Sequence, residues 1–115
     1  MSDSPVDKEA LFTLVDEDAA FLERLVDTFL ADCSTYMDAI RTAVKEEDAQ
    51  ALTRVAHGLK GAVANLQAPS AQEAAHRLEV MGRSGEFDGA DSALEALEHE
   101  IHQLRSVLTE MVEEL

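Results

Sequence analysis

The chain has 115 residues, enough for one domain with a single hydrophobic core. Its formal net charge is −15, which argues against a nucleic-acid partner, because binding to phosphate backbones requires clustered Lys and Arg side chains. Hydrophobic residues make up 46% of the sequence but aromatic residues only 4%. Because Ala and Leu are strong helix formers and there are only two prolines, this composition favours an all-helical domain.

Nothing in the sequence indicates a membrane segment or an exported protein. No apolar run approaches the roughly 18 residues that span a bilayer, and the N-terminus MSDSPVDKEA is too polar and acidic for a signal peptide. The single cysteine, Cys33, excludes an internal disulfide. We therefore expect a cytoplasmic protein that does not contact membranes.

The first half of the chain predicts a flexible N-terminus over residues 1–6, followed by a single domain over 7–115. A short helix is predicted over 7–15, with Leu11, Leu14 and Val15 as its apolar face. The acidic segment Asp16-Glu-Asp18 offers an N-cap and a favourable first turn for a long helix over about 18–46. Apolar residues recur on this helix at steps of three and four: Leu22, Leu25, Val26, Phe29, Cys33, Met37, Ile40 and Val44.

Three further helices are predicted in the second half, over about 49–66, over about 69–83, and from Asp88 or Asp91 to about 112. Asp48 is a good N-cap for the first of them. Pro69 suits a first helical turn, and Ser70 with Glu73 could form a capping box. The glycine-rich segment 82–89 predicts a loop, after which Asp88 or Asp91 would cap the last helix.

These elements predict an all-α fold in which the four longer helices form an up-down-up-down antiparallel four-helix bundle, with one short additional N-terminal helix. Short connections favour antiparallel neighbours, which is the basis of this topology. A coiled-coil homodimer is the structural alternative, but the loop signals argue against one long helix. We therefore expect a monomer.

The segment AHGLKG, residues 56–61, is unusual because it places two glycines inside the third long helix, where each is unfavourable by roughly 1 kcal/mol relative to Ala. At about 100° per residue, His57 lies about 140° from Leu52, which marks the core stripe. It shares its face with Gly61 and Ala64, and Lys60 follows one turn later. The sequence therefore predicts an exposed imidazole that no neighbouring side chain shields.

No Asp or Glu occurs from Ala49 through Gln72, a segment that also carries Arg54. A buried helix would explain the absence of acids, and so would a surface that receives an anion. A bare helical face with one nucleophile, His57, and one cation, Lys60, meets the needs of phosphoryl transfer between proteins. The imidazole would attack phosphorus and the ammonium would balance the arriving charge.

The segment AHGLKGAVANL resembles the signature of histidine-containing phosphotransfer (HPt) domains, His-x-Leu-Lys-Gly followed by small residues. The segment HRLEVMGRSGEF is similar to the family's Leu-Glu pair and glycine-containing loop. The resemblance implies a phosphorelay intermediate in which His57 accepts a phosphoryl group from a receiver-domain aspartate and passes it to another. Lys60 would lie near the phosphoryl oxygens. The partners would be response-regulator receiver domains and a hybrid histidine kinase.

The resemblance also implies that this chain binds no cofactor or metal itself, because the receiver would supply Mg²⁺ and most catalytic groups. A docking surface around His57 is expected to include further residues, which are Arg54, Gly58, Gly61, Ala64 and Gln67. Two of these depart from the family pattern. Gly58 stands where Ser or Thr is common, and Gln67 where Gly is common.

Two alternatives stay open from the sequence. The chain could be a receiver-binding adaptor bundle that is not phosphorylated, or the phosphotransfer domain of a chemotaxis-type histidine kinase. Other candidate sites are weaker. His99 and His102 form a pair on the last helix, but a metal site needs three or four convergent ligands, so they are interpreted as surface residues, as is His76.

Overall fold

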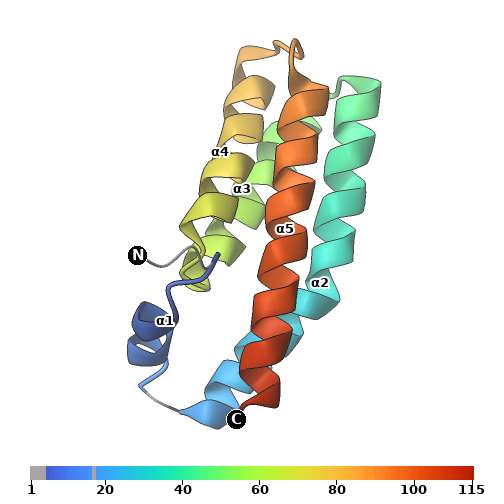
Figure 1. The fold of residues 1–115 in the computed structure, drawn as a ribbon. Helices are drawn as coiled ribbons and strands as arrows, with labels where there is room; N and C mark the ends of the chain where they lie inside the picture. The colour runs from blue at the N-terminus through green and yellow to red at the C-terminus, as the bar shows by residue number, and fades with distance from the viewer. Residues whose placement is uncertain (1–4, 17) are drawn as a thin grey trace.

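A computed structural model describes residues 5–16 and 18–115 of the chain. The helices in this part of the chain are α1 (Lys8–Leu14), α2 (Ala19–Glu46), α3 (Ala49–Asn65), α4 (Pro69–Ser84) and α5 (Ala90–Glu113). The four long helices run alternately up and down, and each packs against two neighbours, in the order α2, α3, α4, α5 and back to α2 (Figure 1). The predicted all-α four-helix bundle with a short N-terminal helix is confirmed.

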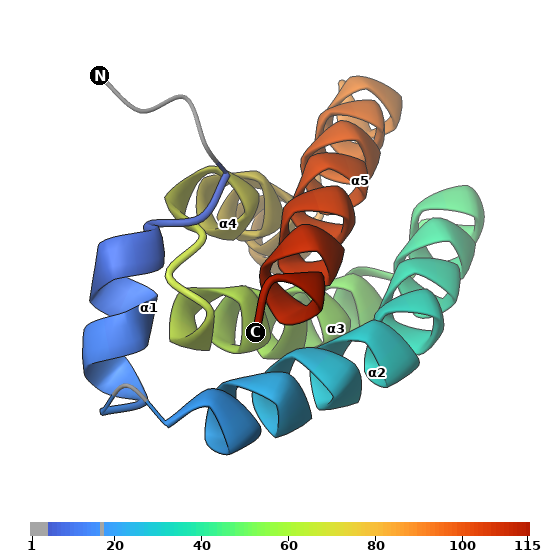
Figure 2. The ribbon, with the colours of Figure 1, turned by 60° about the horizontal axis from the view of Figure 1, so that its bottom comes forward.

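The short helix α1 lies at one end of the bundle, beside the turn between α3 and α4 (Figure 2). Asp7 joins these two segments, because its backbone N–H donates to the Gln67 carbonyl at 2.8 Å while its carboxylate caps α1. The predicted flexible segment 1–6 lies mostly outside the described residues, but Val6 is buried in the core. Leu14, predicted on the apolar face, is 55% exposed instead.

The beginnings of α2 and α3 follow the predicted caps. Asp18 accepts a hydrogen bond from the Phe21 N–H, and Asp48 accepts one from the Ala51 N–H, each at 3.1 Å. Each bond satisfies one of the backbone donors that a helix leaves unpaired in its first turn.

The predicted caps of α4 and α5 are wrong. Helix α4 begins at Pro69, whose fixed φ suits the first turn, so Ser70 already lies inside the helix and forms no capping box. Helix α5 is preceded by Gly89 at φ 81°, a conformation that glycine adopts without steric cost. Asp91 lies in the first turn of α5, and Asp88 precedes the cap.

Glycine 82 lies inside α4, not in the predicted loop. The helix continues to Ser84, and Gly82 is buried against α3. A Cβ built on Gly82 would lie 2.7 Å from the backbone N of Thr53 and 3.0 Å from the carbonyl oxygen of Ala49. Only glycine lets the two backbones approach this closely, so α3 and α4 form a tight pair.

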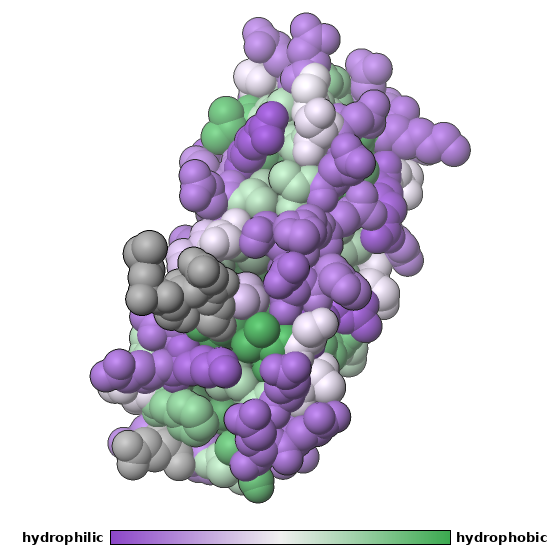
Figure 3. Space-filling model, viewed as in Figure 1, coloured by the Kyte–Doolittle hydropathy of each residue, from purple (hydrophilic) through white to green (hydrophobic). Residues whose placement is uncertain are grey.

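The interior is formed by aliphatic side chains from all five helices, and hydrophilic side chains cover much of the face over α5 (Figure 3). Cys33 is buried, as predicted, and burial raises the pKa of its thiol although Arg105 and Arg41 oppose the shift. None of the helices within residues 5–16 and 18–115 combines the length and apolarity needed to cross a bilayer.

Candidate functional site

His57 projects from the middle of α3 on the side facing α4. Its side chain is 65% exposed, as the helical phase predicts. The backbone is held by the core residues on either side of it, because Ala56 and Leu59 are both fully buried. A rigid helix therefore presents the imidazole at the surface.

The surface next to His57 is open at Gly61. Apart from its neighbours along the chain and the backbone of α3 itself, a Cβ built on Gly61 would meet no described atom within 4 Å. The open space predicted one turn from the imidazole is therefore present at Gly61, and its use in docking stays a prediction. A side chain at this position would project into the space that a partner needs in order to reach the ring.

Beneath His57 lies a carboxylate that sequence reasoning did not assign to the site. Glu79 of α4 is fully buried, and among the described residues no other charged side chain is buried. His57 Nδ1 lies 3.1 Å from Glu79 Oε2, and Lys60 Nζ lies 2.6 Å from Glu79 Oε1. Arg83, one turn further along α4, pairs with Oε2 as well. We call these four residues the Glu79 cluster.

The Glu79 carboxyl is ionised at neutral pH. Burial alone would raise its pKa, but hydrogen bonds from Lys60 and His57, together with the positive charges of Arg83 and Lys60, lower the pKa below its ordinary value. An ionised carboxylate can only accept hydrogen bonds. His57 Nδ1 is therefore the donor of this hydrogen bond, and in the neutral imidazole Nε2 then keeps its lone pair, on the side of the ring away from Glu79.

Lys60 lies where the sequence predicted a cation, but its ammonium is already paired. Its side chain is only 24% exposed, and Nζ points to Glu79. A lysine stem can rotate, so the same ammonium can turn toward an anion on His57.

His76 and Arg83 belong to the surroundings of this site, although the sequence indicated only that His76 is a surface residue. His76 is indeed exposed, with Nδ1 3.8 Å from Glu79 Oε1. The signal that could have identified this group is Glu79 itself. It lies on the buried stripe of α4 with Ala75, Leu78 and Gly82. A charged residue in that phase requires partners, because an unpaired buried charge is very costly.

The remaining predicted docking residues on α3 differ in how far they are exposed to solvent. Arg54 is exposed one turn before His57, and Ala64 is half-buried two turns after it. Gly58 faces α2, where its Cβ would lie 3.3 Å from Cε1 of Tyr36. The absence of a side chain therefore lets the Tyr36 ring lie against α3, which explains why a glycine is suitable here.

Gln67 lies beyond the end of α3, in the turn that leads to α4. Its φ is 57°, in the left-handed region, where glycine is more common. Its side-chain Nε2 donates to the Ala64 carbonyl at 3.4 Å, and its own carbonyl accepts from Asp7. These contacts give Gln67 a structural role in the turn. Its contribution to docking stays a prediction.

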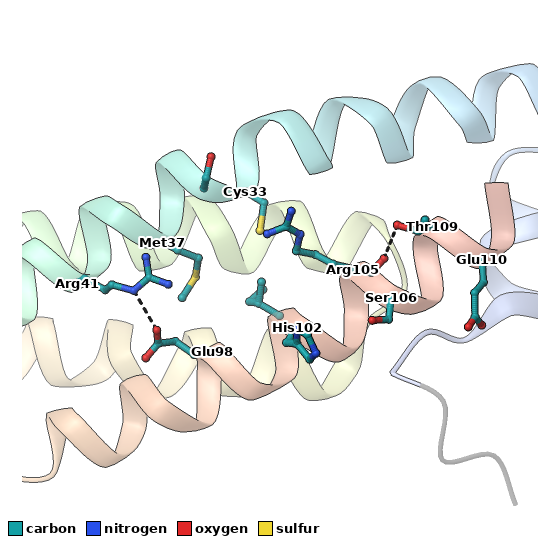
Figure 4. Close-up of a pocket in the computed structure, with 11 residues that line it drawn as sticks. Cys33, Met37, Arg41, Glu98, His102, Arg105, Ser106, Thr109 and Glu110 are labelled. Atoms are coloured by element: carbon teal, nitrogen blue, oxygen red, sulfur yellow. Dashed lines mark hydrogen bonds and ion pairs between the residues drawn. The ribbon is translucent and has the colours of Figure 1, made fainter. Parts of the chain in front are cut away.

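A groove of about 880 Å³ lies between α2 and α5 and does not include His57. Cys33 and Met37 line it from α2, and His102 and Arg105 from α5 (Figure 4). Within the described residues, no three His, Cys, Asp or Glu side chains are grouped as a metal site would require. Cys33 in the groove is buried, whereas His57 is exposed, so the Glu79 cluster is the site that offers an accessible nucleophile beside cations.

Comparisons with known proteins agree with this geometry. The model of the Hpt domain family matches residues 24–107, which include every member of the Glu79 cluster. The crystal structure of histidine-containing phosphotransfer protein B (HptB) from Pseudomonas aeruginosa PAO1 superposes with a TM-score of 0.91 at 27% sequence identity, covering 99% of each chain. No curated protein matches the sequence.

Proposed function

The chain belongs to the Hpt domain family and is a histidine phosphotransfer intermediate of two-component phosphorelays, and from this premise we propose that His57 carries the phosphoryl group. The observation that supports this assignment is the hydrogen bond from His57 Nδ1 to Glu79. It holds the ring in the tautomer whose unprotonated nitrogen, Nε2, faces the solvent.

The transfer step needs no proton movement in this arrangement. The lone pair of Nε2 attacks the phosphorus of an aspartyl phosphate, an N–P bond forms, and the P–O bond to the aspartate breaks. The aspartate leaves as a carboxylate with the electron pair. The ring retains its Nδ1 proton and becomes positively charged, and the negative Glu79 beneath it stabilises that charge. The reverse step returns the phosphoryl group to an aspartate by the same path.

Lys60 and Gly61 serve the incoming group in different ways. Lys60 comes from the same helix face, one turn after His57, so its ammonium can approach the phosphoryl oxygens by rotating its stem. Gly61 leaves the approach to Nε2 open. The chain therefore acts as a phosphocarrier, and the catalytic groups that complete the transfer come from the partner.

The partners that we propose are receiver domains of response regulators, with the receiver of a hybrid histidine kinase as donor. Mg²⁺ would be held in the receiver, not in this chain. Arg54, Gly58 and Ala64 lie along α3 around His57 and form the docking surface in this proposal. We further propose that the chain works as a monomer in the cytoplasm.

The experiment that tests this proposal is phosphoryl transfer from a phosphorylated receiver to the wild type, to His57→Gln and to His99→Gln. His99 is an exposed histidine on α5 and provides the matched control. We expect acid-labile, alkali-stable label on the wild type and on His99→Gln, and none on His57→Gln. Equal labelling of all three proteins would contradict the assignment. Receiver binding without any label would favour the adaptor alternative.

A further inference from the structure

We propose that Arg83 is a positioning residue whose guanidinium stays paired with Glu79. The Lys60 ammonium can then leave the carboxylate and follow the phosphoryl group. The inference rests on the proposed function of His57. It arises because two cationic side chains, those of Lys60 and Arg83, pair with the one buried carboxylate of Glu79.

The two oxygens of Glu79 are occupied differently. Oε1 faces the Lys60 ammonium at 2.6 Å, with His76 Nδ1 further away at 3.8 Å. Oε2 accepts from His57 Nδ1 at 3.1 Å and also pairs with Arg83. Lys60 can therefore leave Oε1 without disturbing the contacts on the other oxygen.

The phosphoryl group and Glu79 lie on opposite sides of the imidazole, since Nδ1 points to the carboxylate and Nε2 points away from it. One ammonium cannot neutralise both. If Lys60 were the single cation of the site, its departure would leave a fully buried carboxylate with a histidine alone beside it. Breaking a buried ion pair in this way is strongly unfavourable. Arg83 lowers that penalty, because it keeps a full positive charge beside the Glu79 carboxylate.

Arg83 suits the role of the cation that stays. It lies four residues after Glu79 on α4, so the pair is formed within one helix and does not depend on the spacing between helices. A guanidinium remains charged at any physiological pH. Lys60, by contrast, comes from α3 and is one turn from His57, so it is the cation that can reach Nε2.

The test is a double-mutant cycle with phosphoramidate as a small phosphodonor, which makes the identity of the receiver irrelevant. The rate of His57 phosphorylation is measured for the wild type, Lys60→Ala, Arg83→Gln and the double variant. Without Arg83, Lys60 is retained by Glu79 and is lost to the reaction. We therefore expect each single variant to be slower by about tenfold, and the double variant to be no slower than the singles.

Matched variants separate this role from a general effect of charge or stability. Arg77→Gln removes the same type of residue from α4, at an exposed position without an ion pair to any described residue, and should leave the rate unchanged. Arg83→Lys should restore most of the rate. Losses that multiply in the double variant would overturn the proposal, because they would mean that Arg83 contacts the phosphoryl group itself. An unchanged rate in Arg83→Gln would overturn it as well.

A second measurement does not depend on phosphorylation. NMR relaxation of the Lys60 ammonium nitrogen reports how firmly Glu79 holds it in the resting protein. We expect this ammonium to be more ordered in Arg83→Gln than in the wild type and in Arg77→Gln. Unchanged order would contradict the proposed exchange. If the wild type takes no label on His57, the proposed function fails, while the ammonium measurement still decides whether Arg83 loosens Lys60.

Discussion

The two long sides of the bundle handle charge in opposite ways. Between α2 and α5, Arg41 pairs with Glu98 at 3.0 Å at the rim of an open groove (Figure 4). Arg41 also pairs at 3.0 Å with Asp38 of its own helix, and all three side chains are exposed to water. Between α3 and α4, the carboxylate of Glu79 is withdrawn completely from water. Water screens the first group and leaves it energetically weak, whereas the buried carboxylate of the second group is unscreened and orients the His57 ring.

The difference shows where a bundle of this size builds a reactive site. The groove between α2 and α5 is a hollow of about 880 Å³, but the charged side chains Arg41 and Glu98 at its rim neutralise one another in solvent. The pair α3–α4 is tight, and among the described residues it is there that a buried carboxylate lies within hydrogen-bond distance of an exposed histidine. Small residues make this possible, since Gly82 brings the helices together and Gly61 leaves the histidine accessible.

The largest expected effect comes from removing the buried charge. Glu79→Ala should slow phosphorylation of His57 by about 100-fold, because Nδ1 loses the acceptor that orients the ring. Glu98→Ala, which removes an acid from the groove, should leave the rate within experimental error of the wild type. Transfer kinetics from one phosphorylated receiver measure both variants. Equal losses would mean that the two sides do not differ in the way described.

The close packing of α3 and α4 predicts the next effect. Gly82→Ala should lower the free energy of unfolding by about 1–3 kcal/mol, because the new Cβ would clash with the backbone of α3 and neither helix can yield easily. Gly61→Ala is the matched control. Its Cβ enters open space, so the better helix propensity of Ala should raise the free energy of unfolding by up to about 1 kcal/mol. Chemical denaturation of both variants measures the contrast.

A third prediction concerns pH. Burial opposes ionisation of Glu79, but its donors prevail and its pKa is lowered from the ordinary 4.5. The ionised carboxylate therefore stabilises the fold above about pH 4.5, and this contribution is lost as the pH falls through the lower folded value.

Glu79→Gln removes this titration and leaves the other carboxylates in place. Melting temperatures measured from pH 7 down to pH 3 should therefore fall more steeply for the wild type than for Glu79→Gln. Parallel curves for the two proteins would show that the cluster does not contribute to acid sensitivity.

The smallest expected effect is on the groove side. Arg41→Ala should lower the free energy of unfolding by at most about 1 kcal/mol, because its ion pairs are exposed. The loss should shrink further in high salt, which screens surface pairs. Denaturation at two salt concentrations tests this. A large, salt-independent loss would place Arg41 in the same class as the buried Glu79 pairs.

The helices and their buried faces followed from the sequence wherever the signal is local. The three- and four-residue spacing on α2 and the caps Asp18 and Asp48 depend on neighbours within one turn. The capping residue of α5 was missed because Gly89, not an aspartate, provides the turn. Gly82 was predicted to lie in a loop because the residue that requires a glycine at this position, Thr53, lies on another helix.

The candidate site divides in the same way. The phase of α3 and the family resemblance were enough to place His57, Lys60 and Gly61. Glu79 was missed because the partners that make its burial tolerable come from α3 as well as α4, and spacing along one helix does not reveal them. The choice of glycine at position 58 could not be explained from the sequence for the same reason, because the ring that lies against it, Tyr36, belongs to α2.

The open face around His57 has a consequence for signalling in time. A phosphoryl group on Nε2 would stand outside the bundle, as accessible to water as to the next protein. The lifetime of the N–P bond would then be set by hydrolysis, unless a receiver arrives first and removes the phosphoryl group. The signal would therefore be passed on only where the receiver is abundant enough to bind before the phosphoryl group is hydrolysed.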